Sequence, residues 1–172
     1  MGASEAVTAA GGVHGFPAAL TSFIGRAGPV REVAGLLEQH RLVTVTGPGG
    51  VGKTRLAGEM ARAVARRFGD GTWLAELAPV RNPAQVPGVV AAALGVRELP
   101  GVTAVEVLAR VLATSREPLA VTGEARYRLG PLALPSGADP GEAGGSEAVR
   151  LFADRARQVD RVSCWTTRPG PW

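Results

Sequence analysis

Residues 42–57 of the chain read LVTVTGPGGVGKTRLA, a stretch that contains a predicted strand, a glycine-rich turn and the start of a predicted helix. Leu42–Thr46 is a short run rich in β-branched residues that ends at a glycine-rich break, which predicts a buried strand. From Thr54 to Phe68, apolar or small side chains recur at helical spacing with charged residues between them, which predicts an amphipathic helix. A strand, a glycine-rich turn and a helix therefore follow one another along the chain.

The turn between this strand and this helix matches the pattern G-x4-G-K-[ST]. Glycines let backbone N–H groups curl around phosphate oxygens without a clash from Cβ, and the helix start adds the positive end of its dipole. Lys53 is expected to reach the β- and γ-phosphates, and the Thr54 hydroxyl to hold Mg²⁺. The residues predicted to bind the nucleotide are Gly47, Pro48, Gly49, Gly50, Val51, Gly52, Lys53, Thr54 and Arg55.

The amino-acid composition supports the interpretation of this turn as a phosphate-binding motif. The chain has 19 basic residues, and Lys53 is the only lysine among them. Arginine's planar fork suits a phosphate cradle less well than a compact ammonium, so the one lysine stands where a lysine is needed. The arginines alternate with acidic residues instead of forming a basic block, and the net charge is only +4, so the composition does not demand a nucleic-acid partner.

Several classes of protein are excluded by simple counts. One cysteine allows neither an internal disulfide nor a cysteine zinc cluster, and two histidines make no ligand set. No apolar run approaches the roughly 20 residues of a membrane span, and the first residues do not have the pattern of a secretory signal, so we expect a cytoplasmic protein without a membrane partner. The only asparagine, Asn82, is far from Lys53 in sequence, so the guanine-reading Asn-Lys-x-Asp segment is missing and ATP is the expected nucleotide.

The remaining chain predicts alternating strands and helices, and hence an α/β fold with a parallel sheet. Residues 111–115 (VLATS) read as a strand, but the helical period of Val105, Leu108 and Leu112 continues into them, so both interpretations stay open. We expect a disordered leader over 1–15, a P-loop domain over 16–159 and an irregular tail over 160–172. The other expected elements are a strand over 72–77 and helices over 29–39, from 82 or 87 to 94, from 103 onward and over 146–159.

An ordered set of segments resembles the nucleotide-binding domain of STAND-type signalling ATPases, specifically the NB-ARC-like modules of actinobacterial transcriptional regulators of the AfsR/LuxR-associated type. The segments are Phe23–Arg26 (FIGR), residues 42–57, Thr72–Pro83 (TWLAELAPVRNP), Val111–Leu119 (VLATSREPL), Tyr127–Pro135 (YRLGPLALP) and Glu147–Ala156 (EAVRLFADRA). The resemblance covers residues 16–158 and implies a three-layer P-loop NTPase fold.

The resemblance also implies roles for individual residues. Phe23 would lie against the adenine, with Gly25 and Arg26 near the nucleotide. Arg116, at the end of the TSR segment, would sense the γ-phosphate. The implied function is an Mg-ATP-binding module of a signalling regulator, with a regulator protein or a second copy as its protein partner, and with DNA reached only through other domains.

One departure from this family concerns hydrolysis. A hydrolysing P-loop ATPase needs an acidic residue at the end of a second apolar strand, and no apolar run between Arg55 and Arg116 ends in aspartate. Glu76 matches a different strand of the family, and Glu106 reads as part of a helix capping box. We therefore expect that a strand–helix unit of about 30–40 residues is missing. We also expect that its strand belonged beside the strand of residues 42–46, that the sheet is incomplete, and that hydrolysis is weak or absent.

Two other functions remain open at this stage. A small P-loop kinase has a similar length, but it would need an acceptor site and an arginine-bearing lid, which the sequence does not clearly provide. The chain could also be a non-enzymatic remnant that associates with a regulator or with DNA. Only its basic pI of about 10.5 supports this interpretation. Whether the chain is an enzyme is therefore left undecided by its sequence.

Overall fold

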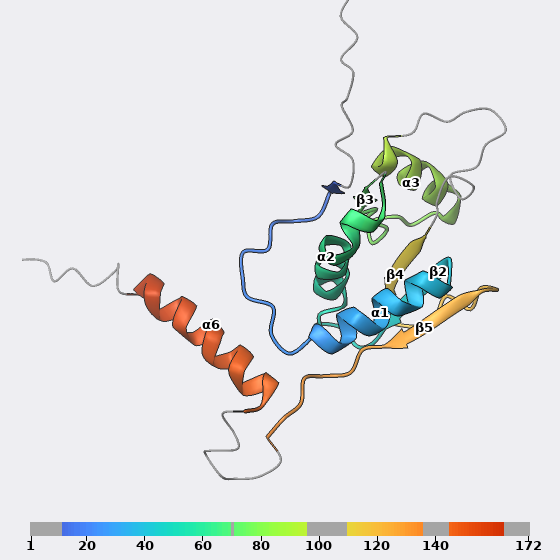
Figure 1. The fold of residues 1–172 in the computed structure, drawn as a ribbon. Coiled ribbons are helices and arrows are strands. Elements are labelled where there is room, and N and C mark those ends of the chain that lie inside the picture. Colours follow the sequence, from blue (N-terminus) through green and yellow to red (C-terminus); the bar gives the residue numbers. More distant parts are fainter. Residues whose placement is uncertain (1–11, 70, 96–109, 136–144, 164–172) are drawn as a thin grey trace, which may run out of the picture. The chain divides into compact units, whose positions relative to one another are not determined.

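The computed structural model describes residues 12–69, 71–95, 110–135 and 145–163, and the chain divides into two compact units (Figure 1). The first comprises the described parts of Met1–Ala18 and Pro29–Leu129, and the second those of Ala19–Gly28 and Gly130–Trp172. The predicted α/β class is confirmed, since parallel strands and helices build the first unit.

A parallel three-stranded sheet forms the centre of the first unit. Its middle strand is β2 (Leu42–Thr46), which pairs with β4 (Val111–Ser115) on one side and β5 (Glu124–Arg128) on the other. In this register Thr46 lies level with Ser115 and with Arg128, so all three strands end at one edge. Residues 111–115 are therefore a strand, which resolves the ambiguity of their pattern.

The β2 strand has neighbours on both sides and is buried through its middle. Val43, Thr44 and Val45 are fully buried, as expected for a parallel strand covered on both faces. The prediction that a missing strand would belong beside β2 is wrong, because β4 and β5 occupy both positions. An additional strand could extend this sheet only at its outer edges.

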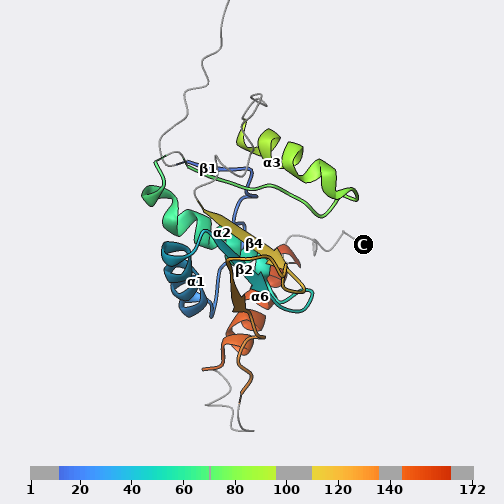
Figure 2. The same ribbon diagram turned by 90° about the vertical axis from the view of Figure 1, so that its right-hand side faces the viewer.

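Two helices accompany this sheet, α1 (Ala27–Gln39) and α2 (Lys53–Val64), and α2 continues into the short 3-10 helix η1 (Ala65–Arg67). They lie side by side (Figures 1 and 2). Both have the predicted apolar stripe: Val33 and Leu37 are buried on α1, and the buried positions of α2 and η1 are Leu56, Ala57, Gly58, Met60, Ala61, Val64 and Ala65. The sequence placed both helices correctly, to within a few residues at their ends.

A second, two-stranded sheet in this unit joins β1 (Val13–His14) to β3 (Thr72–Trp73) in parallel. The His14 and Trp73 rings stack with their centroids 5.0 Å apart. Two predictions are corrected here. Val13 and His14 belong to a strand instead of a disordered leader, and the strand expected over 72–77 ends at Trp73.

The next helical segment starts where the sequence indicated that it could. The Asn82 side chain accepts a hydrogen bond of 3.0 Å from the Ala84 N–H at the start of the short helix η2 (Pro83–Gln85). The helix α3 (Val86–Leu94) follows and ends at Gly95 in the left-handed conformation. The helix expected from Thr103 lies outside the described residues.

The second unit is built around α6 (Glu147–Ser163), which confirms the helix predicted from Ser146 and extends it by one turn into the expected irregular tail. Arg155 of α6 donates to the Ser22 carbonyl at 2.9 Å and to its hydroxyl at 3.1 Å, which ties the segment before α1 to this helix. In the part of the chain that the structure describes, no helix has the length and apolar character needed to cross a membrane.

Candidate nucleotide-binding site

The loop between β2 and α2, Gly47–Thr54, is here called the phosphate loop. Gly50 and Gly52 adopt φ values of 75° and 96°, a left-handed conformation that favours glycine. A Cβ added at Gly49, Gly50 or Gly52 would meet no atom within 4 Å. The glycines therefore line open space beside the loop, where phosphate oxygens can approach the backbone closely.

Gly47 has a different role from the other glycines of the loop. It is buried, and a Cβ added there would lie 2.6 Å from the Leu129 carbonyl oxygen. Leu129 is only 1% exposed, and its N–H donates to the Thr46 carbonyl at 2.8 Å. Gly47 thus lets the end of β2 lie close to the chain that leaves β5, and this packing fixes the base of the phosphate loop.

The Lys53 ammonium folds back over the phosphate loop. Its Nζ donates hydrogen bonds of 2.8 Å to the carbonyl oxygens of Gly47 and Pro48. The side chain is half-buried, and these bonds hold the only positive side-chain charge of the loop above its backbone. An ammonium in this place can exchange carbonyl oxygens for phosphate oxygens with little movement.

The start of α2 adds backbone donors to the site. Gly52 caps this helix without a side-chain hydrogen bond, and the first intrahelical bond is donated by Leu56 to the Gly52 carbonyl at 2.8 Å. N–H groups in a first helical turn have no intrahelical acceptor, and with the helix dipole they favour an anion. The open glycines, the ammonium and the helix start together fit the phosphates of a nucleotide.

The fit to Mg²⁺ is less complete. Thr54 is exposed at the start of α2, where its hydroxyl could hold the ion beside the phosphates. In the described ranges, no group of three or more His, Cys, Asp or Glu side chains could hold a metal ion. None of the strands β2, β4 and β5 is followed directly by a carboxylate, so the ion would depend on Thr54 and on the nucleotide itself.

An open cavity of about 240 Å³ adjoins the start of α2 and is lined by Thr54 and Arg55. Its other lining residues are Phe16, Pro17, Gly58, Arg62 and Leu74. Arg55 Nη2 lies 3.1 Å from Glu59, and Arg62 donates to the Pro17 carbonyl at 2.7 Å. The cavity therefore has apolar walls with arginines held at its rim, next to two residues predicted to bind the nucleotide.

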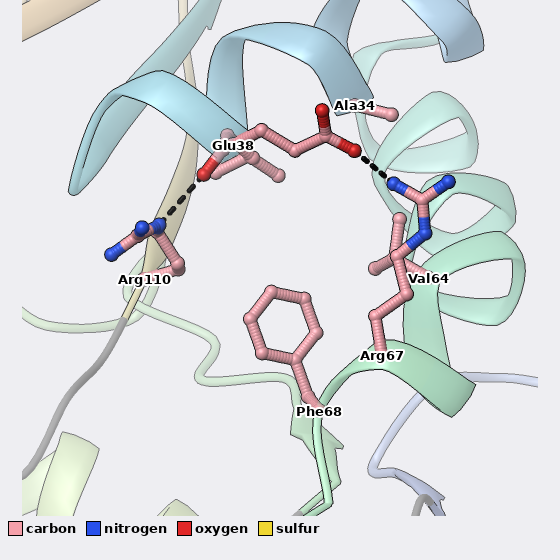
Figure 3. Close-up of a pocket in the computed structure, with 7 residues that line it drawn as sticks. Ala34, Glu38, Val64, Arg67, Phe68 and Arg110 are labelled. Carbon is pink, nitrogen blue, oxygen red and sulfur yellow. Dashed lines mark hydrogen bonds and ion pairs between the residues drawn. The ribbon is translucent and has the colours of Figure 1, made fainter.

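A second open cavity, of about 330 Å³, lies at the opposite end of α2 from the phosphate loop (Figure 3). Phe68 and Val64 form part of its apolar lining. Glu38 of α1 pairs with Arg67, and Arg110 donates from Nε to the Leu37 carbonyl at 2.7 Å. These bonds join the ends of α1, η1 and β4, so this cavity belongs to the packing between these elements and not to the predicted site.

Arg116 follows the last residue of β4 directly and is exposed. Ser115 is paired with Thr46, the residue before the phosphate loop. Arg116 and Gly47 therefore leave neighbouring parallel strands at the same edge of the sheet. The role of Arg116 as a sensor of the γ-phosphate comes from resemblance alone, and it stays a prediction.

Phe23, Gly25 and Arg26 belong to the second unit. Phe23 is half-buried, and Arg26 donates to the Gly130 carbonyl at 2.8 Å. Gly25 has a φ of 74°, and a Cβ added there would lie 2.7 Å from side-chain atoms of Glu147, at the start of α6. The described geometry thus gives Gly25 and Arg26 roles inside this unit, and their contact with a nucleotide stays a prediction.

Comparison with known families agrees with this site. The family model described as an AAA ATPase domain matches residues 22–165, which is most of the chain. The chain belongs to the AAA ATPase domain family. The match covers the phosphate loop, α2 and the strand that leads to Arg116, and it supports a nucleotide-binding module of the P-loop NTPase class.

Two curated relatives come from Mycobacterium tuberculosis. One is an uncharacterized protein, 33% identical over 176 residues that cover 81% of this chain and 42% of the relative. The other is named "Putative HTH-type transcriptional regulator" and is 33% identical over 160 residues, covering 72% of this chain and 17% of the relative. The chain thus spans less than half the length of either relative. No solved structure matches the chain significantly.

The uncharacterized relative has residues in the matched region that this chain lacks. The alignment to this relative is 176 positions long, but the 81% of this 172-residue chain that it includes is only about 139 residues. About 37 aligned positions therefore hold a residue of the relative and none of this chain. In total these positions are about as many as the residues of one βαβ unit, roughly 30 or more.

Proposed function

We propose that this chain binds Mg-ATP through the phosphate loop as the nucleotide-binding module of a STAND-type, NB-ARC-like signalling or transcriptional regulator, and hydrolyses it slowly or not at all. The observation that carries the proposal is the loop itself. Its glycines face open space, and the Lys53 ammonium lies over its carbonyls at 2.8 Å. Resemblance to a protein named as a transcriptional regulator supports the regulatory role.

In the proposed complex, the backbone N–H groups of the loop and of the first turn of α2 bind the phosphates. Lys53 balances the charge of the β- and γ-phosphates, and Thr54 holds Mg²⁺. Mg²⁺ neutralises charge between the terminal phosphates when it is bound. Arg116 detects whether a γ-phosphate is present, since it leaves β4 beside the strand that leads into the loop.

Slow or absent hydrolysis is proposed on two grounds. In the described part of the sheet no strand leads directly into a carboxylate, the group that would polarise an attacking water. The alignment to the relative also leaves about 37 of the relative's positions in total without a counterpart in this chain, a number large enough to include a strand–helix unit with such a group. ATP would then act as a ligand that changes the state of the module.

The test is a calorimetric titration of the full 172-residue chain with Mg-ATP and Mg-GTP, combined with an assay for phosphate release. We expect saturable binding of ATP, weaker binding of GTP, and phosphate release that is slow or no faster than that of the nucleotide alone. A chain that binds no ATP contradicts the proposal. Phosphoryl transfer to a small added acceptor would instead identify a kinase.

A further inference from the structure

The chain crosses from β4 to β5 in eight residues, Arg116–Gly123, here called the crossover segment. Because β4 and β5 lie on opposite sides of β2 and run parallel, this segment must pass back along the sheet from the end of one strand to the start of the other. Such connections usually take a dozen or more residues and contain a helix. A short crossover without a helix depends on other interactions to hold it in place.

Glu124 supplies these interactions. Its carboxylate accepts hydrogen bonds from the Leu119 N–H at 2.9 Å and from the Ala120 N–H at 3.0 Å, one to each oxygen. The Glu124 N–H also donates to the Val121 carbonyl at 3.2 Å. Ala120 has a φ of 57°, in the left-handed region that a residue with a Cβ adopts only when its surroundings hold it there.

The carboxylate is well placed for this role. The Glu124 side chain is 1% exposed, although the residue stands at the first position of an edge strand. The Thr44 side chain, the Leu119 and Ala120 amides and the Arg126 guanidinium lower the pKa of Glu124, so it is ionised at neutral pH. A carboxylate held by two amide donors makes charge-assisted hydrogen bonds, which are stronger than neutral ones.

At the other end of the crossover segment, the Ser115 hydroxyl accepts a hydrogen bond from the Glu117 N–H at 3.3 Å. The chain is therefore fixed on both sides of Arg116. Ser115, before it, belongs to β4. After it, the backbone N–H groups of Glu117, Leu119 and Ala120 donate to the side chains of Ser115 and Glu124. We infer that Glu124 is a positioning residue for Arg116: it holds the crossover segment so that the Arg116 guanidinium stays at the phosphate-loop edge of the sheet. This inference rests on the proposed function of Arg116.

The experiment compares the affinities of the full chain for Mg-ATP and Mg-ADP by calorimetry, because only ATP carries the γ-phosphate. Arg116→Ala should lower the ratio of ATP to ADP affinity about tenfold, the loss typical of one charge-assisted hydrogen bond. Glu124→Gln should lower the ratio in the same direction, by about three- to tenfold, with little change in ADP affinity. The double variant should lose no more than Arg116→Ala alone, since the two residues act through one contact.

Glu117→Gln is the matched control, because it removes an acidic charge from the same segment at an exposed position. It should leave the ratio unchanged. If Glu124→Gln does not fold, Glu124→Asp keeps the charge but cannot span both amides, and it should lower the ratio by a smaller factor.

Two failures can be told apart. A wild-type chain that binds no ATP, or an Arg116→Ala variant with an unchanged ratio, contradicts the proposed function. If Arg116→Ala lowers the ratio while the folded Glu124 variants keep it, or weaken ATP and ADP equally, Glu124 has only a structural role and the inference is wrong.

Discussion

The phosphate loop and the crossover segment both follow strands at the same edge of the sheet, but they are held by different means. The phosphate loop depends on glycines in left-handed conformations and on Lys53 bonded to the loop's own carbonyls. The crossover segment has only one glycine, Gly123, and is held by bonds from the Ser115 and Glu124 side chains to its backbone.

This difference matches the two tasks proposed for the loops. A loop that must wrap around phosphates keeps its N–H groups for the ligand, so its backbone freedom comes from glycine. A segment that presents one arginine at a defined place must be rigid before the ligand arrives, because a flexible one would lose ordering entropy on binding.

The largest effect is expected at Lys53. Lys53→Ala should weaken both nucleotides by about 10- to 100-fold, and ATP at least as much as ADP, since it removes a charged donor to the β-phosphate of both and to the γ-phosphate of ATP. Calorimetric titration checks this result. Arg66→Ala, an exposed change at the far end of the same helical segment, is the charge-matched control and should leave both affinities unchanged. If wild type and Lys53→Ala bind ATP and ADP with equal affinity, the phosphate loop is not the nucleotide-binding site.

The next effect concerns the base of the phosphate loop. Gly47→Ala should lower the free energy of unfolding by about 1–3 kcal/mol, because its Cβ would lie 2.6 Å from the Leu129 carbonyl oxygen. Gly49→Ala places its Cβ in open space and should change stability by no more than about 0.5 kcal/mol. Urea denaturation without nucleotide measures both variants. Similar losses in the two would show that Gly47 has no special packing role.

A smaller effect is expected at Thr54. Thr54→Ala should remove most of the gain in ATP affinity that Mg²⁺ provides, about tenfold or less, and leave binding in EDTA unchanged, because its hydroxyl is the proposed ligand to the ion. Titrations with and without Mg²⁺ check this. Thr54→Ser keeps the hydroxyl and should behave as wild type. An undiminished Mg²⁺ effect in Thr54→Ala would assign the ion to other ligands.

The smallest effect is a pH dependence at the crossover segment. The pKa of Glu124 is lowered in the folded chain from its ordinary value of 4.5, so its stabilising bonds are present above about pH 4.5 and are lost as the pH falls through the lowered value. Thermal melts in acid should therefore show wild type losing stability more steeply than Glu124→Gln below about pH 4.5. If the melting temperatures of the two proteins fall in parallel with pH, the loss of stability in acid does not come from the protonation of Glu124.

The phosphate loop could be predicted from the sequence because its chemistry is local. Strand β2, the glycines, Lys53 and α2 follow one another within a short stretch, and each has its own pattern. The crossover segment depends on pairing between distant residues. Strand β5 was missed because its five residues (EARYR) include three charged ones, and β4 stayed ambiguous until its pairing with β2 was seen.

Glu124 was missed for the same reason, since a single acid beside a Thr-Gly turn has no pattern of its own. Its importance appears only when its carboxylate is seen bonded to Leu119 and Ala120. The predicted strand over 72–77 failed differently, because only Thr72 and Trp73 find a partner in β1. In each case the local structure depends on pairing between distant strands more than on the preferences of the individual residues.

The most direct test of the central claim is the melting temperature of the full chain with and without millimolar Mg-ATP. A ligand that binds only the folded state stabilises it by about 2.7 kcal/mol at a hundred times its Kd, which raises the Tm by several degrees. We expect such a rise in wild type and its loss in Lys53→Ala. A Tm that millimolar Mg-ATP leaves unchanged would contradict nucleotide binding by this chain.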